Sequence, residues 1–528
     1  IRFNIRAFDM NRGLQIQQLE SNQSREWDII VIGGGATGLG TALDAATRGY
    51  RTVLFEQSDF TKGTSSRSTK LVHGGVRYLA QGDVLLVKEA LYERGLMLRN
   101  APHLTVNQEF VIPVYTYWDV FFYTVGLKFY DLLSGRLSMG KSYFINRSKT
   151  LERIPPLKAE GLKGGIVYHD GQFDDSRMAL AIASACVKNG GTVLNYFRVD
   201  SLLKNDQGRV SGVEVTDVET GKVYNIKSKL VINATGVFAD QIHRMDDPLA
   251  PATIKPSQGV HIVLDKSFVK GDSAIMIPKT DDGRVLFAIP WYGKLVVGTT
   301  DTPLNDISLE PKALQEEIDF ILRTAGKYLT RAPRREDVLC IFAGLRPLAA
   351  NPNKPEATKE VSRRHKISLS RSGLLSIIGG KWTSYRRMAE ETVDRAIRAG
   401  ILEKRKCMTR SFSFCSPSVN TIPEQFRIYG DRAPDIVNLI ENEPGMAELV
   451  HPKLPYCKAE IAWIAANEMP RTLEDMLARR TRALFLDARA SAEAGPVVAG
   501  IMAKELGFGK DWIDRQLHDY EKVLENYL

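Results

Sequence analysis

Cysteine pairs and long uncharged apolar runs are both missing from this sequence. Its 5 cysteines are spread over 528 residues without any C-x-x-C pair, so neither a disulfide framework nor a zinc site is predicted, and we expect no metal. A reducing compartment suits such a composition best, and we expect a cytoplasmic protein. Residues 1–26 contain no uninterrupted apolar stretch of signal-peptide length, which argues against secretion.

The most apolar segment, residues 115–133, is interrupted by Asp119, Lys128 and Asp131. A helix that spans a bilayer needs about 20 nearly uncharged residues, so no spanning helix is predicted here. With helical spacing, one face of the segment would carry Trp118, Phe122, Val125, Phe129 and Leu132. Such a face is typical of an interfacial anchor, but the more ordinary interpretation, which we favour from sequence, is a core helix beneath a sheet.

The size and charge of the chain set wide limits on its function. A 58.9 kDa chain with 44% hydrophobic and 25% charged residues predicts a folded protein of two or three structural units. The 71 Lys and Arg exceed the 62 Asp and Glu, which gives a net charge of +9. This excess favours phosphorylated metabolites, acidic lipid surfaces or nucleic acid as partners, without choosing among them. Residues 327–410 hold about 20 of the basic residues against about 8 acidic ones.

A complete βαβ unit is predicted near the amino terminus. The apolar run 28–32 is followed by GGGATG at 33–38, a helical stretch to residue 48, and a second strand that ends in Glu56. Gly33 permits the tight turn, Gly35 lets backbone N–H groups approach a pyrophosphate, and Gly38 lets helix and strand pack closely. Glu56 can bind a ribose hydroxyl. This unit therefore predicts a dinucleotide site.

Three later segments carry further signals. A hydroxyl-rich loop at 64–69 runs into a glycine pair and Arg77, a strand at 229–233 ends in Ala-Thr-Gly, and a strand at 374–378 leads into GGKWTSY. The strand at 229–233 follows alternating runs at 210–215 and 223–226, which read as a β-meander. A meander that feeds a strand ending in Ala-Thr-Gly is poorly explained by NAD binding alone.

Taken together, these segments resemble the FAD-dependent glycerol-3-phosphate dehydrogenase family, within the D-amino-acid oxidase-like flavoproteins. The resemblance rests on GGGATG at 33–38, TSSRSTKLVHGGVRYL at 64–79, NATG at 233–236, GTTD at 298–301, AGLRPL at 343–348 and GGKWTSYR at 379–386. It extends from about residue 28 into the last helices, where LEDMLARRTR at 473–482 looks like the signature of the family's final domain. The resemblance implies an α/β fold: an FAD-binding Rossmann-like domain with an antiparallel-sheet substrate domain and an α-helical C-terminal domain.

We divide the chain accordingly. Residues 1–26 form an N-terminal extension, 27–410 form the FAD-binding and substrate domains interleaved in sequence, 411–423 form a Ser/Pro-punctuated linker, and 424–528 form the α-helical C-terminal domain. In the last part, apolar residues three and four apart predict helices at 458–467, 472–487, 490–506 and 510–527. Few residues there suggest a catalytic or ligand-binding role, so we expect a packing or assembly domain.

The resemblance implies the oxidation of sn-glycerol 3-phosphate to dihydroxyacetone phosphate by hydride transfer to FAD, with electrons passed to a membrane quinone. We therefore expect peripheral attachment to an anionic membrane surface, on the inner face of the cytoplasmic membrane. Segment 115–133 and the basic stretch are the two candidates for the attaching surface. A homodimer is among the assemblies considered, and no nucleic acid is expected as a partner.

The resemblance also assigns site residues. His261 is implied as the general base, and Arg346 as the group that polarises the C2 oxygen or shares in proton abstraction. Arg77 and Lys381 are implied to hold phosphate, with Tyr78 and Thr383 as hydroxyl partners. The expected cofactor-binding residues are Gly33, Gly35, Gly38, Glu56, Thr64, Ser65, Ser66, Ser68, His73, Gly74, Ala234, Gly236, Gly380 and Lys381.

Three alternatives compete with this hypothesis. An oxygen-using glycerophosphate oxidase would carry an insertion before the last flavin segment, but only 32 residues lie between Arg346 and Gly379. An amino-acid oxidase of the same fold also uses an arginine in a Gly-x-Arg-Pro setting, but its monoanionic substrate would not require both Arg77 and Lys381. A non-enzymatic or tRNA-modifying FAD protein would want a basic patch with interleaved aromatics, which the sequence lacks.

Overall fold

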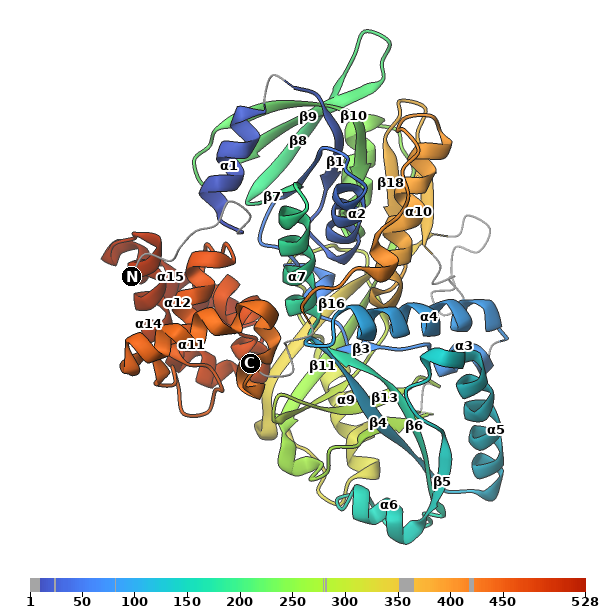
Figure 1. The fold of residues 1–528 in the computed structure, drawn as a ribbon. Helices are drawn as coiled ribbons and strands as arrows, with labels where there is room; N and C mark the ends of the chain where they lie inside the picture. The colour runs from blue at the N-terminus through green and yellow to red at the C-terminus, as the bar shows by residue number, and fades with distance from the viewer. Residues whose placement is uncertain are drawn as a thin grey trace.

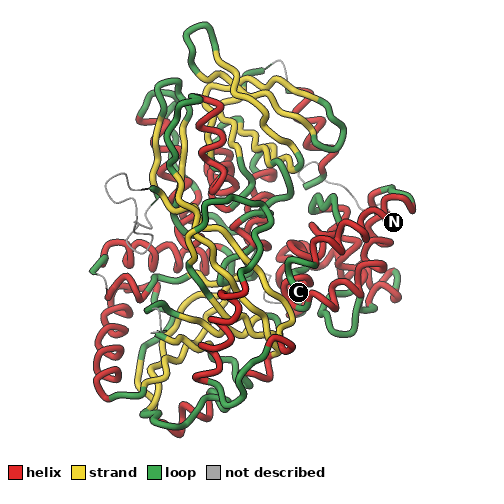
Figure 2. The backbone as a smooth tube through the Cα atoms, turned by 180° about the vertical axis from the view of Figure 1, so that it is seen from behind, coloured by secondary structure: helices red, strands yellow, loops and turns green. Residues whose placement is uncertain are grey.

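The computed structural model describes residues 10–22, 25–80, 82–278, 280, 283–350, 365–416 and 422–528. Two sheets and a helical C-terminal region make up the molecule (Figure 1). The helical region lies beside both sheets, and Figure 2 shows it as red helices joined by green loops, without strands in the part that is drawn in colour.

The first sheet holds the predicted dinucleotide unit. Its central strands run β17-β18-β10-β1-β2-β7, and β8 and β9 extend it from β10 as an antiparallel meander. Pairing is parallel from β18 through β10, β1 and β2 to β7. The strands are β1 (Trp27–Ile32), β2 (Thr52–Glu56), β7 (Thr192–Asn195), β8 (Phe197–Lys204), β9 (Val210–Asp217), β10 (Val223–Asn233), β17 (Lys366–Leu369) and β18 (Leu375–Ile378).

Both faces of this sheet are covered. Ile29 and Val31 pack with the helices α2 (Ala36–Thr47), α7 (Asp175–Lys188) and α10 (Tyr385–Arg398). Ile30 and Ile32 pack instead with residues of the meander. The continuous apolar run of β1 thus belongs to a strand buried on both faces, as predicted.

The second sheet is mostly antiparallel and curled, and it runs β15-β11-β14-β13-β12-β4-β6-β3, with β16 on β11 and β5 on β6. Its strands are β3 (Leu71–Val72), β4 (Thr105–Val114), β5 (Tyr143–Asn146), β6 (Gly164–Phe173), β11 (Ile254–Asp265), β12 (Ala274–Ile277), β13 (Leu286–Trp291), β14 (Lys294–Gly298), β15 (Thr302–Pro303) and β16 (Val338–Ala349). The long pairing of β11 with β16 places His261 opposite Phe342 and Ser257 opposite Arg346.

The remaining helices surround these sheets or form the C-terminal region. They are α1 (Arg12–Ser21), α3 (Val76–Ala80), α4 (Val84–Asn100), α5 (Tyr117–Ser134), α6 (Arg147–Arg153), α8 (Ala239–Asp246), α9 (Gln315–Tyr328), α11 (Ala433–Asn442), α12 (Lys458–Asn467), α13 (Ala483–Leu486), α14 (Ala488–Leu506) and α15 (Lys510–Leu524). Helix α12 has the predicted bounds, and α14 and α15 fall within a few residues of theirs. In the described part of the chain, no helix is both long and apolar enough to cross a bilayer.

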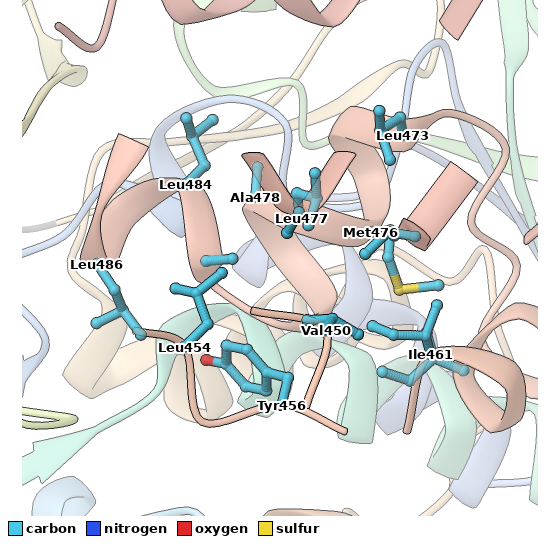
Figure 3. Close-up of a cluster of buried hydrophobic side chains, with 14 of the residues drawn as sticks. Val450, Leu454, Tyr456, Ile461, Leu473, Met476, Leu477, Ala478, Leu484 and Leu486 are labelled. Carbon is cyan, nitrogen blue, oxygen red and sulfur yellow. The ribbon is translucent and has the colours of Figure 1, made fainter. Parts of the chain in front are cut away.

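Segment 472–487 departs from the single helix that was predicted. Residues Asp475–Arg480 form a π-helical turn, and Arg482 then adopts a left-handed backbone with φ of 67° before α13 begins. Its apolar residues still enter a common core, in which Leu473, Met476 and Leu477 lie with Leu484 and Leu486 (Figure 3). This core also includes Phe342 and Trp291 of the second sheet, so the helical region is joined to that sheet by continuous packing.

The expectation that segment 115–133 forms a core helix is wrong. It forms α5, but the predicted apolar face points outward: Trp118 is 69% exposed and Leu132 73% exposed. The side that packs inward carries Leu127 and Tyr130. Apolar spacing identified the helix but could not show which side the rest of the molecule covers.

Candidate active site

One cavity of about 680 Å³ lies between the two sheets. It opens where β1 and β10 end, which is where ligands bind in parallel sheets, and its other wall belongs to β11 and β16. Its lining includes the predicted residues Gly33, Gly35, Glu56, Thr64, Ser65, Ser68, His73, Tyr78, Ala234, Gly236, His261, Arg346, Gly380, Lys381 and Thr383. Gly38, Ser66 and Gly74 are absent from this lining. Arg77 belongs to α3, but its side chain lies outside the described part of the structure.

The first turn of the βαβ unit forms a cradle of backbone that side chains would fill. Gly33 has φ of 109°, and a Cβ on it would lie 2.7 Å from the carbonyl oxygen of Ala234. A Cβ on Gly38 would overlap the carbonyl oxygen of Gly33, whereas one on Gly35 would meet only the Ser65 hydroxyl, at 3.1 Å. Helix α2 starts at this cradle, so its N-terminal N–H groups and dipole favour a phosphate there.

Glu56 closes the loop that follows the cradle. Its carboxylate accepts hydrogen bonds from the backbone N–H groups of Gly34 (2.6 Å) and Ser58 (2.9 Å). Burial raises the pKa of Glu56 despite these two bonds, and the neighbouring Asp59 adds to the rise. Glu56 therefore shapes the loop at the end of β2 as well as lying on the cavity wall, where a ribose hydroxyl is expected.

The hydroxyl-rich loop connects the cradle to the second sheet. Ser65 Oγ accepts from the N–H of Ala36 (2.9 Å), and Thr64 Oγ1 donates to the carbonyl of Leu345 in β16 (2.5 Å). Ser68 Oγ donates to Asp175 (2.7 Å), at the start of α7. The loop is thus held by a helix of the first sheet and a strand of the second, and it forms the shared floor of the cavity.

The next turn, at residues 73–75, is held by two side-chain hydroxyl groups, those of Thr383 and Tyr130. The N–H of His73 donates to Thr383 Oγ1 (3.2 Å), and the N–H of Gly74 donates to Tyr130 Oη (2.8 Å). A Cβ on Gly74 would meet Tyr130 and Leu91, so this glycine permits close packing of the turn. Thr383, predicted to contact substrate, lines the cavity and also positions His73.

His261 is the most distinctive side chain in the cavity. It is 2% exposed, its Nε2 lies 3.0 Å from Thr69 Oγ1, and its ring stacks on Phe342 with centroids 4.8 Å apart. Nδ1 has no hydrogen-bond partner among the described residues. Burial lowers the pKa of His261 well below its usual value, and Lys70 and Arg346 act in the same direction. The ring is therefore neutral near pH 7 and can accept a proton.

Arg346 is a fixed cation on the same wall. Its two terminal nitrogens donate to Gln258 O (3.1 Å), Asp301 Oδ1 (3.1 Å), Thr299 Oγ1 (3.0 Å) and Thr300 O (2.9 Å). A Cβ on Gly259 would overlap this guanidinium, so the glycine makes room for it. These bonds hold the charge at a defined place, from which it can stabilise negative charge that develops nearby.

Positive charge also gathers around Lys381 in the cavity lining, and we call this part of the lining the cationic end. Lys381 Nζ lies 3.8 Å from the centroid of the Tyr78 ring, a cation–π contact that fixes both side chains. Arg284 lines the cavity as well. This end can accommodate an anionic group, and Arg346 supplies a further positive charge on the wall with His261.

Sequence reasoning gave no role to several of these residues. Thr69 lies inside the quoted motif at 64–79, but its contact with His261 joins positions 192 residues apart. Gly298 and Asp301 belong to the GTTD motif; a Cβ on Gly298 would overlap the His261 ring, and Asp301 pairs with Arg346. Arg284 had no signal in the sequence. The motifs marked the right segments for the first three, but only the strand register shows what each residue contacts.

Two family models match the chain. The model described as FAD dependent oxidoreductase matches residues 28–386, and the model described as the C-terminal domain of alpha-glycerophosphate oxidase matches residues 371–512. The first match includes both walls of the cavity. The second includes Lys381 and most of the helical region.

Named relatives match over nearly the whole chain. The chain is 42% identical to the probable mitochondrial glycerol-3-phosphate dehydrogenase of Caenorhabditis elegans, over 92% of this chain and 72% of that one. It is 39% identical to the mitochondrial glycerol-3-phosphate dehydrogenase of Homo sapiens, over 97% and 75%. The solved structure of glycerol-3-phosphate dehydrogenase from Bacillus halodurans complexed with FAD superposes with a TM-score of 0.77 at 30% identity, covering 98% of each chain.

Proposed function

Because the chain belongs to the FAD-dependent oxidoreductase family, we propose that it is a glycerol-3-phosphate dehydrogenase, which oxidises the C2 hydroxyl of sn-glycerol 3-phosphate to give dihydroxyacetone phosphate. The observation that carries this proposal is a neutral, buried histidine and a cationic end within one cavity. The relatives that match most of the chain bear the name of this activity.

FAD is the cofactor, and the glycine cradle fits its pyrophosphate. Gly33, Gly35 and the first N–H groups of α2 would hold the pyrophosphate, and Glu56 the ribose. When bound, FAD supplies the acceptor for the hydride that leaves C2. The cavity reaches from the cradle to His261, so a dinucleotide lying along it would bring its reactive end toward that residue.

We assign the phosphate of the substrate to the end with Lys381. Lys381 presents an ammonium that Tyr78 holds in place, and Arg284 adds a second positive charge to the lining. Arg77, on the same turn as Tyr78, stays part of this proposal on the strength of its motif alone. A dianionic phosphate balances several cations, which the carboxylate of an amino acid would not.

We assign the proton transfer to His261. Its neutral ring can take the C2 hydroxyl proton as the hydride departs, and the fixed charge of Arg346 lowers the energy of the alkoxide that develops. Thr69 holds Nε2, and Gly298 leaves space for the ring. Nδ1, which is buried and has no hydrogen-bond partner among the described residues, is the nitrogen that we propose as the proton acceptor.

We further propose that the reduced enzyme passes its electrons to a membrane quinone and that α5 attaches it to the membrane. Tyr117, Trp118, Phe121 and Phe122 are exposed on α5, and Lys163 Nζ lies 5.5 Å from the Tyr117 ring centroid. Aromatic side chains with a nearby cation suit an anionic lipid surface. The cytoplasmic membrane expected from sequence and the mitochondrial location in the relatives' names are the alternatives that cell fractionation distinguishes.

Anaerobic spectroscopy tests the reaction. Purified protein should bleach on adding glycerol 3-phosphate, and much less on adding glycerol, because only the former fills the cationic end. Reoxidation by a soluble quinone that is faster than reoxidation by air supports the quinone acceptor, whereas fast reoxidation by air identifies an oxidase. An unbleached flavin contradicts the proposed substrate.

Liposome sedimentation tests the attachment. The triple variant Trp118→Ser, Phe121→Ser, Phe122→Ser should lose binding to anionic vesicles while it still bleaches with substrate. If the wild-type protein does not bind vesicles and sediments as a homodimer in which α5 is buried, the exposed face of α5 would instead be the contact with a second copy of the chain.

A further inference from the structure

Behind the floor of the cavity lies a buried lysine to which the proposed reaction gives no role. Lys70 is 0% exposed, and its Nζ donates to Ser66 O (2.7 Å) and to Asp175 Oδ2 (2.7 Å). The ring centroids of Trp291, Phe342 and Phe485 lie 5.2 to 5.4 Å from the same nitrogen. Burying a charged ammonium among aromatic rings is costly unless it is paired. A lysine that is buried despite this free-energy cost is a candidate for a functional role.

The helical C-terminal region supplies a second cation to the same two acceptors. Arg482 donates to Ser66 O (2.8 Å) and to Asp175 Oδ1 (3.1 Å). Burial would raise the pKa of Asp175, but Lys70 and Arg482 together hold it below its usual value, so the carboxylate is ionised. One carboxylate therefore holds both cations, and Asp174 lies 3.7 Å from Arg482 Nε. Because Arg482 belongs to the C-terminal region, this cluster joins that region to the hydroxyl-rich loop at 64–69.

Two contacts connect Lys70 to His261. Thr69, the preceding residue, places Oγ1 3.0 Å from His261 Nε2. Phe342 contacts both side chains: the imidazole stacks on its ring, and the lysine nitrogen lies 5.2 Å from the centroid of that ring. Lys70 itself has a left-handed backbone with φ of 64°, which fixes the direction in which the chain leaves Thr69.

The charges around His261 are few. In the part of the chain that the structure describes, Lys70 from the loop and Arg346 from β16 are the charged groups that act on it. The other neighbours are the Thr69 hydroxyl, the Phe342 ring and the backbone of Gly298 on β14. Of the carboxylates that the structure describes, none acts on His261, since Asp301 pairs with Arg346 and Asp175 with Lys70 and Arg482.

We propose that Lys70 is a positioning residue for the proton transfer: anchored by Asp175 and Arg482, it fixes the Thr69 hydroxyl against His261 and opposes the charging of the imidazole. This inference rests on the proposed function. Burial lowers the pKa of Lys70 itself to about 7, and Arg482 acts in the same direction, so Lys70 is a cation mainly below neutral pH. In that pH range it keeps His261 in the neutral form, which alone accepts a proton, and it favours release of that proton after each turnover. The C-terminal region thus contributes to the reaction without touching substrate.

The test is the pH dependence of anaerobic flavin reduction at saturating glycerol 3-phosphate. In the wild-type enzyme the rate should fall only at a pH well below 6.5, where His261 becomes protonated. Lys70→Met removes the charge and keeps the length, so the fall should move to higher pH by about one unit. Lys70→Arg keeps the charge and should leave the fall at its wild-type pH, even if the rate drops at every pH.

Arg177→Met is the matched control. Arg177 is also a buried cation between the first sheet's helices and the C-terminal region, paired with Glu468 and 4.8 Å from the Tyr429 ring centroid, but it does not line the cavity. Its loss should lower the melting temperature without moving the fall in rate. A fall at the wild-type pH in Lys70→Met, or an equal shift in the control, overturns the proposal.

Lys70→Arg decides the question if Lys70→Met does not retain FAD. An unmoved fall with a rate within about tenfold of wild type supports the role of the charge, and a fall shifted upward overturns it. Failure of the proposed function looks different, because wild-type enzyme would then not bleach with glycerol 3-phosphate at any pH.

Discussion

The two walls of the cavity are built in different ways. The wall from the first sheet consists largely of backbone: a glycine cradle, the start of α2 and the end of β10. The wall from the second sheet consists of side chains, chiefly His261 and Arg346, whose places depend on the pairing of β11, β14 and β16. A backbone wall binds the constant part of a cofactor, whereas a side-chain wall sets the chemistry. Substitutions in the two walls should therefore fail in different ways.

The largest expected effect is on the backbone wall. A Cβ at Gly38 would overlap the Gly33 carbonyl oxygen, a backbone atom in the tight turn directly after β1. Gly38→Ala should therefore weaken FAD binding by about 3 kcal/mol or more, so that the protein elutes from gel filtration without its colour. Gly500→Ala, in α14, is the control, because a Cβ there has nothing within 4 Å and the residue does not line the cavity. Equal flavin content in the two variants would contradict the geometry of the cradle.

Substitutions in the side-chain wall should lower the rate of flavin reduction rather than the flavin content of the protein. His261→Ala should lower the rate of anaerobic flavin reduction by about 10² to 10⁴-fold, and Arg346→Ala by about 10² to 10³-fold. Both proteins should stay yellow, since neither residue touches the cradle.

Their pH responses should also differ. His261→Ala should abolish the fall in rate on acidification, because no base is left to protonate. Arg346→Ala should move that fall to higher pH, since removing a cation that lowers the pKa of His261 lets the ring protonate earlier. Stopped-flow bleaching across pH separates the two. A His261→Ala enzyme that keeps the wild-type rate and its acidic fall would assign the base to another residue.

The same contrast explains how much could be predicted from sequence. The βαβ unit, residues 27–56, is local, and its turn chemistry alone predicted β1, α2 and β2. The overall class was also predicted: a Rossmann-like sheet, an antiparallel sheet and a helical C-terminal region are confirmed by the superposition on the Bacillus halodurans structure and by the family models. The site residues stay predictions, although the structure brings most of them to one cavity.

What the sequence could not predict depends on distant partners. The outward face of α5 has the spacing of a core helix, and only the absence of a covering layer in the described structure distinguishes the two. Arg479 and Arg480, at the end of the π-helical turn Asp475–Arg480, bind Asp59 some 420 residues away. Helical periodicity carries no information on such contacts, because buried arginines read as surface residues.

The smallest expected effect is at the cationic end, where the two walls meet. Lys381→Ala removes a charge-assisted contact with the substrate phosphate, worth about 1.5 to 3 kcal/mol, so KM for glycerol 3-phosphate should rise about 10 to 100-fold. The limiting rate of flavin reduction should change little, because the phosphate is bound equally before and during hydride transfer. Turnover of glycerol, which lacks the phosphate, should be nearly unaffected.

Tyr78→Phe is the matched control: it keeps the ring 3.8 Å from Lys381 Nζ and should raise KM less than Tyr78→Leu, which removes the ring. A Lys381→Ala enzyme that still discriminates glycerol 3-phosphate from glycerol as well as wild type would move the phosphate site to another part of the cavity, with Arg284 as the next candidate.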